Sequence, residues 1–237
     1  MEKKEQLYEG KAKKVFATED PELLIVAYKD DATAFNGLKK GTISGKGIIN
    51  NQMSNRLMAM LESKGIPTHY VEELNQRETL VKKVQIVPLE VIVRNIAAGS
   101  FSKRYGVQEG VVFKQPTIEF SYKNDDLADP LLNTRHALAL ELATPEEIAA
   151  IEDYSFRINE ALKSFWLSCG VTLVDFKLEF GRLQDGTIVL ADEISPDTCR
   201  LWDSKTGEKL DKDRFRRDLG GVEEAYCEIM RRLEANI

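Results

Sequence analysis

The stretch 174–180 constrains the fold more than any other part of the chain. Its apolar residues alternate with Asp175, Lys177 and Glu179. This alternation has the period of a β-strand, and it places the three charged side chains on one face. A second apolar stretch, 188–194, follows after a short interval. We therefore predict two antiparallel strands that present a charged face.

The interval between these strands determines their expected pairing. Asp185-Gly186 is a strong signal for a two-residue hairpin turn, so Gln184 would face Thr187 and Glu179 would lie opposite Asp192. Two facing carboxylates repel each other by roughly 0.2–1 kcal/mol, and a divalent cation between them removes the repulsion. Magnesium commonly takes one or two protein carboxylates and completes its shell with phosphate and water. We therefore predict a magnesium–phosphate site; the alternative is a half-exposed hairpin with a solvated charged face.

The chain is long and apolar enough to form a substantial core. It has 237 residues, of which 43% are hydrophobic, so we expect one large domain or two lobes. The formal net charge of −6 argues against general nucleic-acid binding, although local basic clusters can bind an anionic substrate. The three cysteines show no disulfide or zinc pattern, and no signal or membrane-spanning stretch is present. These features predict a soluble cytoplasmic protein.

Hydrophobic periodicity predicts a mixed content of strands and helices. We expect a hairpin around Gly10, strands at 23–28, 69–71, 79–81 and 86–93, and helices at 45–64, 144–170 and 221–233. Thr144, Pro145 and Glu147 have the pattern of a capped helix start. Groups of strands with helices between them, without regular β-α-β alternation, indicate an α+β fold. We divide the chain into a strand-rich nucleotide-binding lobe, 1–88, and an α+β lobe with the metal and substrate sites, 89–237.

Two lysine-containing segments are candidates for nucleotide binding. Residues 10–14 combine a glycine with three lysines at the expected hairpin turn. Glycine permits close approach of the backbone to a phosphate, and a glycine-containing hairpin covers the phosphates in kinases; the alternative is a solvated turn. Lys82 and Lys83 precede the apolar segment 86–90, whose backbone groups could bind adenine. The alternative there is an edge strand protected by lysines.

Other polar clusters are candidates for substrate binding. Arg94 and Ser100 flank a run of small residues, and a guanidinium with a hydroxyl suits a phosphate monoester; the alternative is an ordinary turn. The residues after the second hairpin strand can bring Asp197 and Arg200 to the same end of the sheet, where Arg200 would add a second phosphate contact. The polar loop 123–130 is either a further substrate contact or a solvated turn.

Two long stretches, 86–100 and 173–181, resemble the two signature segments of the SAICAR synthetase family. Segments 8–13, 122–130 and 192–203 are similar to further motifs of that family, in the family's order. The resemblance therefore covers the whole chain. One departure is that some relatives have Asp in a turn where this chain has Phe35-Asn36-Gly37.

The resemblance implies an ATP-dependent ligase of de novo purine biosynthesis. Members join the carboxylate of carboxyaminoimidazole ribotide (CAIR) to the amine of L-aspartate, and they release SAICAR, ADP and phosphate. The implied fold is two-lobed and related to ATP-grasp and kinase-like nucleotide folds, and bacterial members are often homodimers. Because a carboxylate is a poor acylating group, we expect ATP to convert it to an acyl phosphate that the amine attacks. Catalysis is then mainly positioning and charge stabilisation.

The resemblance and the residue chemistry together give each candidate an expected role. The expected ATP ligands are Lys11, Ala12, Lys13 and Lys82 at the phosphates, with Glu90 on the adenine side. The expected magnesium ligands are Glu179 and Asp192. The ribotide phosphate is assigned to Arg94, Ser100 and Arg200, with Asp197 as a further substrate-binding residue. Asp175 and Lys177 are expected to orient the reacting carboxylate or to accept the amine proton, and Lys123 and Asp129 are assigned to aspartate.

Two other functions are compatible with these residues. A small-molecule kinase would share the nucleotide site and transfer the phosphoryl group to a hydroxyl. A non-catalytic nucleotide-binding module would hold ATP without turnover. Aspartate-dependent formation of ADP separates the three functions, because a kinase needs no amine and a binding module releases no product.

Overall fold

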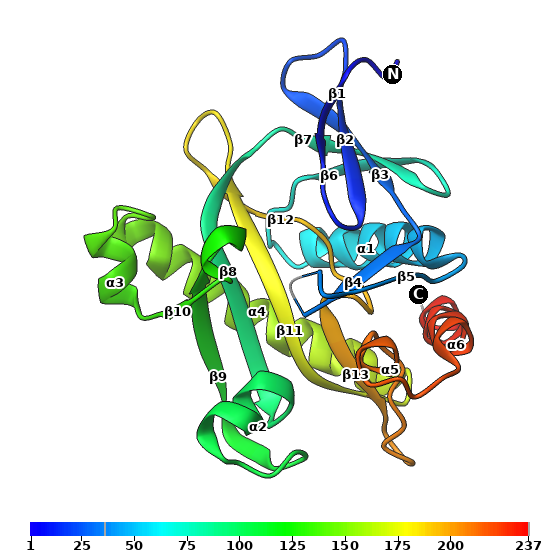
Figure 1. Cartoon of the computed structure of the whole chain (residues 1–237). Coiled ribbons are helices and arrows are strands. Elements are labelled where there is room, and N and C mark those ends of the chain that lie inside the picture. The colour runs from blue at the N-terminus through cyan, green and yellow to red at the C-terminus, as the bar shows by residue number, and fades with distance from the viewer. Residues whose placement is uncertain (36, 237) are drawn as a thin grey trace.

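The computed structural model describes residues 1–35 and 37–236, and it confirms an α+β fold built on antiparallel sheets. The first sheet has the strand order β1-β2-β3-β7-β6. Its strands are β1 (Gln6–Glu9), β2 (Lys13–Ala17), β3 (Leu23–Tyr28), β6 (Tyr70–Asn75) and β7 (Glu78–Lys82). Helix α1 (Lys46–Ser63) packs against β3, β6 and β7 (Figure 1). The expected hairpin around Gly10 is therefore confirmed as β1–β2.

The second sheet is larger and is organised around a long central strand. Its order is β10-β9-β8-β11-β12, and β13 also pairs with β11. The strands are β8 (Gln85–Ile96), β9 (Val112–Tyr122), β10 (Leu131–Leu132), β11 (Val171–Arg182), β12 (Ile188–Ala191) and β13 (Cys199–Asp203). On one side of β11, β12 pairs with residues 179–182 and β13 with residues 171–176. Strand β8 occupies the other side, so β11 is flanked along nearly its whole length.

Helices cover this sheet and connect it to the first one. They are α2 (Gly99–Tyr105), η1 (Asp125–Leu127), α3 (Thr134–Ala139), α4 (Pro145–Ser168), α5 (Asp213–Arg216) and α6 (Val222–Glu234). Helix α4 begins as expected, because the Thr144 side chain and Glu147 form the predicted capping box and Pro145 occupies the first turn. No helix in the described ranges is long and apolar enough to cross a membrane.

A small hairpin bridges the two parts of the molecule. It consists of β4 (Asp31–Ala34) and β5 (Lys39–Thr42) and lies between the N-terminal strands and α5 (Figure 1). Lys39 Nζ donates to the backbone oxygen of Phe215 at 2.5 Å, and a side chain at Gly41 would press on the Phe215 ring. The glycine therefore allows the hairpin to pack closely on α5.

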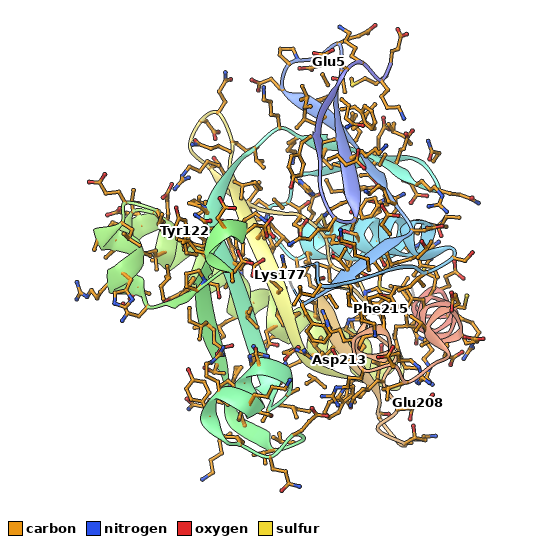
Figure 2. All side chains as sticks on the ribbon, in the orientation of Figure 1. Glu5, Tyr122, Lys177, Glu208, Asp213 and Phe215 are labelled. Carbon is orange, nitrogen blue, oxygen red and sulfur yellow. The ribbon has the colours of Figure 1, made fainter. Side chains whose placement is uncertain are left out.

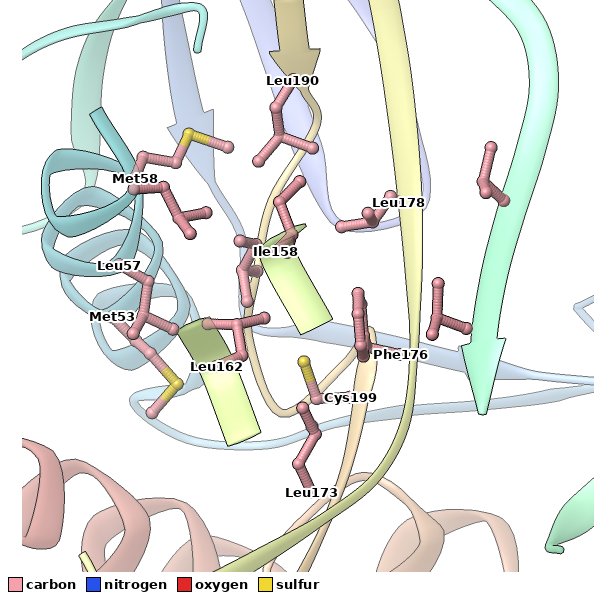
Figure 3. Close-up of a cluster of buried hydrophobic side chains, with 14 of the residues drawn as sticks. Met53, Leu57, Met58, Ile158, Leu162, Leu173, Phe176, Leu178, Leu190 and Cys199 are labelled. Atoms are coloured by element: carbon pink, nitrogen blue, oxygen red, sulfur yellow. The ribbon is translucent and has the colours of Figure 1, made fainter. Parts of the chain in front are cut away.

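One hydrophobic core joins α1 to the larger sheet and α4, and Val26, Tyr28 and Val81 of the first sheet form a small separate cluster. Helices α1 and α4 both lie on the apolar side of the larger sheet (Figure 3). Their facing side chains are Met53, Leu57 and Met58 of α1 and Ile158 and Leu162 of α4. The segment before β6 also contacts β12 of the larger sheet directly, because His69 N donates to Leu190 O at 2.8 Å. Sheet membership changes between Lys82 and Gln85, three residues before the division at residue 88. The two-lobe division itself remains a prediction.

Candidate active site

A cavity of about 900 Å³ lies between the first sheet, the β4–β5 hairpin and the larger sheet. All the side chains that were assigned a role from the sequence line it. Lys177 lies near the middle of the molecule on β11, and Asp213 and Phe215 mark α5 at the opposite wall (Figure 2). The topology thus brings together residues that are spread over most of the chain.

One end of the cavity is apolar. Its lining includes Val15, Leu24, Val26, Val81, Val84 and Ile86, which come from β2, β3, β7, the connection between β7 and β8, and the start of β8. An apolar slot beside the lysines of 11–13 suits a flat aromatic base next to its phosphates. Lys82 also lines this end, and its Nζ donates to Thr68 O at 3.0 Å.

The predicted hairpin register was wrong by one residue. Glu179 lies opposite Ala191, and Leu183 N donates to Thr187 O at 2.9 Å, so three residues form the loop instead of two. In a regular strand this register would turn Asp192 to the opposite face from Glu179. However, β12 ends at Ala191, and Asp192 has a φ of 57°. The left-handed backbone redirects its carboxylate toward the cavity.

Lys177 is the point where the acidic side chains of the cavity meet. Its Nζ lies 2.6 Å from Glu179 Oε1, 2.9 Å from Glu90 Oε1 and 3.9 Å from Asp192 Oδ2. Glu90 on β8 is the residue directly opposite Glu179, so Glu90, and not Asp192, forms the facing pair of carboxylates. Burial alone would lower the pKa of Lys177, but the three carboxylates outweigh it and raise that pKa above its ordinary value.

Two other lysines complete this charged cluster. Lys13 bonds to Asp192 and lies 3.2 Å from Glu193 Oε1, and Lys123 Nζ lies 3.1 Å from Glu179 Oε1. Burial opposes the charge on Asp192, yet Lys13 and Lys177 overcome it and hold the pKa of Asp192 well below its usual range. Asp192 is therefore ionised, as a carboxylate ligand of a hard cation must be.

Glu179 and Asp192 suit a magnesium ion better than a metal ion whose ligands all come from the protein. Their oxygens approach the same lysine, and magnesium accepts one or two carboxylates with phosphate and water as the other ligands. Within residues 1–35 and 37–236, no group of three or more His, Cys, Asp or Glu side chains is arranged to hold a metal ion. The residues present therefore fit a magnesium ion that is bound together with a phosphate chain.

A second cluster centres on Asp175, which is 3% exposed. The sheet places Asp175 of β11 between Arg94 of β8 and Arg200 of β13. Arg94 Nη1 donates to Asp175 Oδ2 at 2.5 Å, and Arg200 Nη1 donates to the same oxygen at 3.0 Å. Arg94 also bonds Ser100 Oγ at 3.1 Å and Glu119 at 2.6 Å. The result is a preorganised pair of guanidinium groups with a hydroxyl beside them.

The segment 94–100 is not an ordinary turn. Arg94 lies within β8, and Gly99 and Ser100 begin α2. Gly99 has a φ of 53°, and a Cβ there would collide with the guanidinium of Arg200. Only glycine therefore allows the start of α2 and Arg200 to approach this closely.

Comparison with known proteins explains this combination of sites. A family model described as SAICAR synthetase matches residues 6–233. The chain belongs to the SAICAR synthetase family. It is therefore an ATP-dependent ligase of purine biosynthesis, and the family that was inferred from the motifs is confirmed.

Individual members of the SAICAR synthetase family are similar over their full length. A phosphoribosylaminoimidazole-succinocarboxamide synthase of Lachnoclostridium phytofermentans is 64% identical over 233 residues, which cover 98% of this chain and 99% of the relative. The crystal structure of the synthase of that name from Ehrlichia chaffeensis is 50% identical with a TM-score of 0.96 and covers 98% of this chain and 99% of that one. A SAICAR synthetase solved in complex with ADP is 49% identical with a TM-score of 0.93, covering 95% and 96% of the two chains.

Several side chains that were assigned as ligands in this SAICAR synthetase family member have protein partners. Lys11 Nζ donates to Asp125 Oδ1 at 2.8 Å in an exposed pair. Asp129 accepts a hydrogen bond from Asn124 N at 2.8 Å and so shapes its own loop. Asp197 is bound by two lysines and a tyrosine. Asn36, whose role was left open, lies outside the described residues.

Other residues of the cavity were not assigned from the sequence. They are His69, Glu193, Lys212 and Arg216, and the buried Lys46 lies behind them. Burial, followed by the nearby charge of Lys13, lowers the pKa of His69 to about 4, so His69 is neutral at neutral pH. Lys212 and Arg216 belong to the charged segment 212–217, whose sequence is compatible with a charged helix start or with a basic contribution to the cleft. The structure favours the second interpretation, because both side chains line the cavity.

We expect the stability of the protein to depend on Asp211 between about pH 4 and pH 7. This buried carboxylate accepts bonds from Leu201 N and Asp213 N, both at 2.7 Å. Burial, followed by repulsion from Asp213, raises its pKa from 3.8 to about 7. The folded state thus binds the proton more tightly than the unfolded state, so this contribution to stability is complete below the lower value and is lost as the pH rises through about 7.

Urea unfolding of wild type and Asp211→Asn at about pH 5 and about pH 8 checks this expectation. The wild type should lose stability relative to the variant at the higher pH. Parallel stability curves for the two proteins would show that Asp211 keeps an ordinary pKa.

Proposed function

We propose that the cavity joins CAIR to L-aspartate with cleavage of ATP, and that the side chains divide this work as follows. The observation that carries the proposal is the position of Lys177. Its ammonium group lies between the acidic cluster of Glu179 and Asp192 and the guanidinium cluster around Asp175 in one continuous cavity. A phosphate donor and a phosphorylated acceptor can therefore bind side by side.

ATP occupies the end formed by the first sheet. The apolar side chains of β2, β3 and β7 enclose the base, and Lys11, Ala12, Lys13 and Lys82 surround the phosphates. Glu179 and Asp192 would hold magnesium, which would neutralise negative charge on the phosphates of ATP. The lysines that now neutralise these carboxylates are then free to turn toward the phosphates. A family member solved with ADP supports the binding of an adenine nucleotide, and its placement here rests on the side chains that line the cavity.

CAIR occupies the end formed by the larger sheet. Arg94, Arg200 and Ser100 bind its phosphate as charge-assisted donors. This position brings the imidazole carboxylate close to Lys177, and Asp175 fixes the two arginines. Lys177 Nζ donates to Glu90 Oε1 at 2.9 Å, so Glu90 keeps the ammonium group directed into the cavity. The adenine-side role of Glu90 stays a prediction.

The chemistry consists of two displacements. An oxygen of the CAIR carboxylate attacks the γ-phosphorus, ADP leaves, and an acyl phosphate forms. The amine of aspartate then attacks the acyl carbon, phosphate leaves with the former carboxylate oxygen, and the amine loses a proton. Lys177 stabilises the negative charge that passes through both transition states, and Asp175, which lines the same cavity, is assigned as the acceptor of the proton. Lys123 and Asp129 complete the wall on the aspartate side, and we propose a homodimeric, cytoplasmic enzyme.

A substrate-omission assay tests this function. ADP should be released over many turnovers only when CAIR, ATP and L-aspartate are all present, and SAICAR should appear in equal amount. Rapid ADP formation without aspartate would indicate a kinase, and binding of ATP without any turnover would indicate a nucleotide-binding module.

We expect Ser100→Ala to raise the KM for CAIR by roughly tenfold, because it removes a hydroxyl from the phosphate site. The KM for ATP should not change. Ser102→Ala is the matched control, since Ser102 lies in the same helix and its Oγ has no hydrogen-bond partner within the described part of the chain. Equal effects of Ser100→Ala on both substrates would contradict the separation of the two phosphate sites.

A further inference from the structure

One histidine of the cavity has no part in the assignments above. His69 directly precedes β6, is 8% exposed, and lines the cavity together with Lys13 and Asp192. The other histidine of the chain, His136, is exposed and belongs to the capping box of α3. His69 is therefore the histidine whose position beside an expected magnesium ligand calls for an explanation.

The backbone around His69 is tied to both sheets. His69 N donates to Leu190 O at 2.8 Å, and Leu190 N donates to Pro67 O at 2.9 Å. On the other side, Lys82 N donates to His69 O at 2.7 Å. The segment 67–69 thus forms a short bridge between β7 of the first sheet and β12 of the larger one. These bonds fix His69 beside the end of β12.

The conformation of Asp192 needs support from its surroundings. Strand β12 ends at Ala191, and Asp192 has a φ of 57°, in the left-handed region that residues other than glycine adopt only when the surrounding structure holds them there. In the free protein its carboxylate bonds Lys13. The proposed function turns Lys13 toward the phosphates of ATP, so this bond cannot hold Asp192 in the loaded site. A partner of the Asp192 backbone can hold it in both states.

The imidazole of His69 is such a partner. Burial, followed by the charge of Lys13, lowers the pKa of His69, and a hydrogen bond with the backbone of Asp192 opposes this lowering. A hydrogen bond that favours the protonated ring uses a ring N–H as its donor, so the acceptor is the carbonyl of Asp192. The ring is nevertheless neutral, and it can therefore stay beside a cation without repelling it.

We propose that His69 is a positioning residue for the magnesium site, and that its ring N–H holds the carbonyl of Asp192 and so fixes the left-handed turn that directs the Asp192 carboxylate into the cavity. This inference rests on the proposed function. The residues that orient a metal ligand commonly contribute ten- to a hundredfold to metal affinity. The bond from Lys82 N to His69 O also joins this support to a lysine assigned to the phosphates.

Calorimetric titration with ADP, in EDTA and in magnesium, tests this role without turnover. In His69→Leu and His69→Ala, the gain in ADP affinity that magnesium gives should fall by roughly tenfold or more. Their ADP affinity in EDTA should stay at that of wild type. His69→Gln and His69→Asn carry an amide N–H near the positions of Nε2 and Nδ1, and at least one of them should recover the magnesium effect.

Two comparisons separate positioning from a general loss of structure. His136→Leu is the matched control, because His136 is not among the described residues that line the cavity; its magnesium effect should equal that of wild type. In the Asp192→Asn background, His69→Leu should cause little further loss, since the ligand that His69 positions is already removed. A merely structural role would add its full effect in that background.

The outcomes distinguish this inference from the function on which it rests. Wild type that forms no SAICAR would remove the proposed function. A wild type that responds to magnesium, with the same response in His69→Leu and His69→Ala, would overturn the positioning role alone. An equal loss of ADP affinity with and without magnesium would also overturn it, because His69 would then bind the nucleotide itself or only maintain the fold. Failure of both amide variants to recover the magnesium effect would exclude the ring N–H as the group responsible.

Discussion

Glu179→Gln and Asp192→Asn should each weaken magnesium-dependent ATP binding by roughly ten- to hundredfold and reduce turnover at least as much. Each substitution removes one of the two carboxylates that suit the cation. Neither should abolish folding, because the core of the larger sheet is untouched. Without metal, however, both variants should be less stable than wild type, since Glu179 is bound to Lys177 and Lys123 and Asp192 to Lys13.

Titration of nucleotide binding at several magnesium concentrations measures this effect. Asp203→Asn is a suitable control, because Asp203 forms a comparable ion pair with Arg232 away from the cavity. Its magnesium dependence should equal that of wild type. Unchanged magnesium dependence in both cavity variants, together with a loss of stability, would show that the two carboxylates are structural.

Lys177→Met should lower kcat by roughly 10²- to 10³-fold, the usual cost of removing a donor that stabilises developing charge. The ammonium group touches Glu90 and Glu179 directly and lies between the two phosphate sites. Its loss leaves the negative charge of three carboxylates less neutralised, so the variant without substrates should bind magnesium more tightly than wild type. Lys177→Arg should recover the charge but not the geometry, and its kcat should lie between those of the other two proteins.

Single-turnover kinetics and magnesium titration of the free protein test this second prediction. A fall in kcat with weaker magnesium binding would mean that Lys177 only maintains the shape of the site. A normal kcat in Lys177→Met would exclude Lys177 from the chemistry.

The acidic hairpin could be located from the sequence because its charges recur with the period of a strand. Its register could not, since it depends on the conformation of a few turn residues, and Asp192 reaches the cavity through a left-handed backbone that alternation does not reveal. The pairing of Glu179 with Glu90 could not be predicted either, because it requires knowing that β8 is the neighbour of β11.

The buried ion pair of Lys46 and Asp197 behind α5 shows a second reason why the sequence alone does not reveal the whole site. Lys46 and Asp197 are 151 residues apart in the chain, and each lies in a segment with an ordinary local pattern. A lysine near the start of a helix indicates a solvated position, yet here it is fully enclosed. Only the packing of α1 against the second half of the chain makes it the support of a cavity residue. Sequence motifs therefore found the residues that act together locally and missed those that are joined by tertiary contacts.

The central claim is that the cavity activates the CAIR carboxylate by transfer of the γ-phosphoryl group of ATP to one of its oxygens. Turnover of CAIR that carries oxygen-18 in its carboxylate, with mass spectrometry of the released phosphate, tests this most directly. The account predicts one labelled oxygen in each phosphate, because the oxygen that attacks phosphorus leaves with it in the second displacement. Phosphate without the label, formed together with SAICAR, would contradict it.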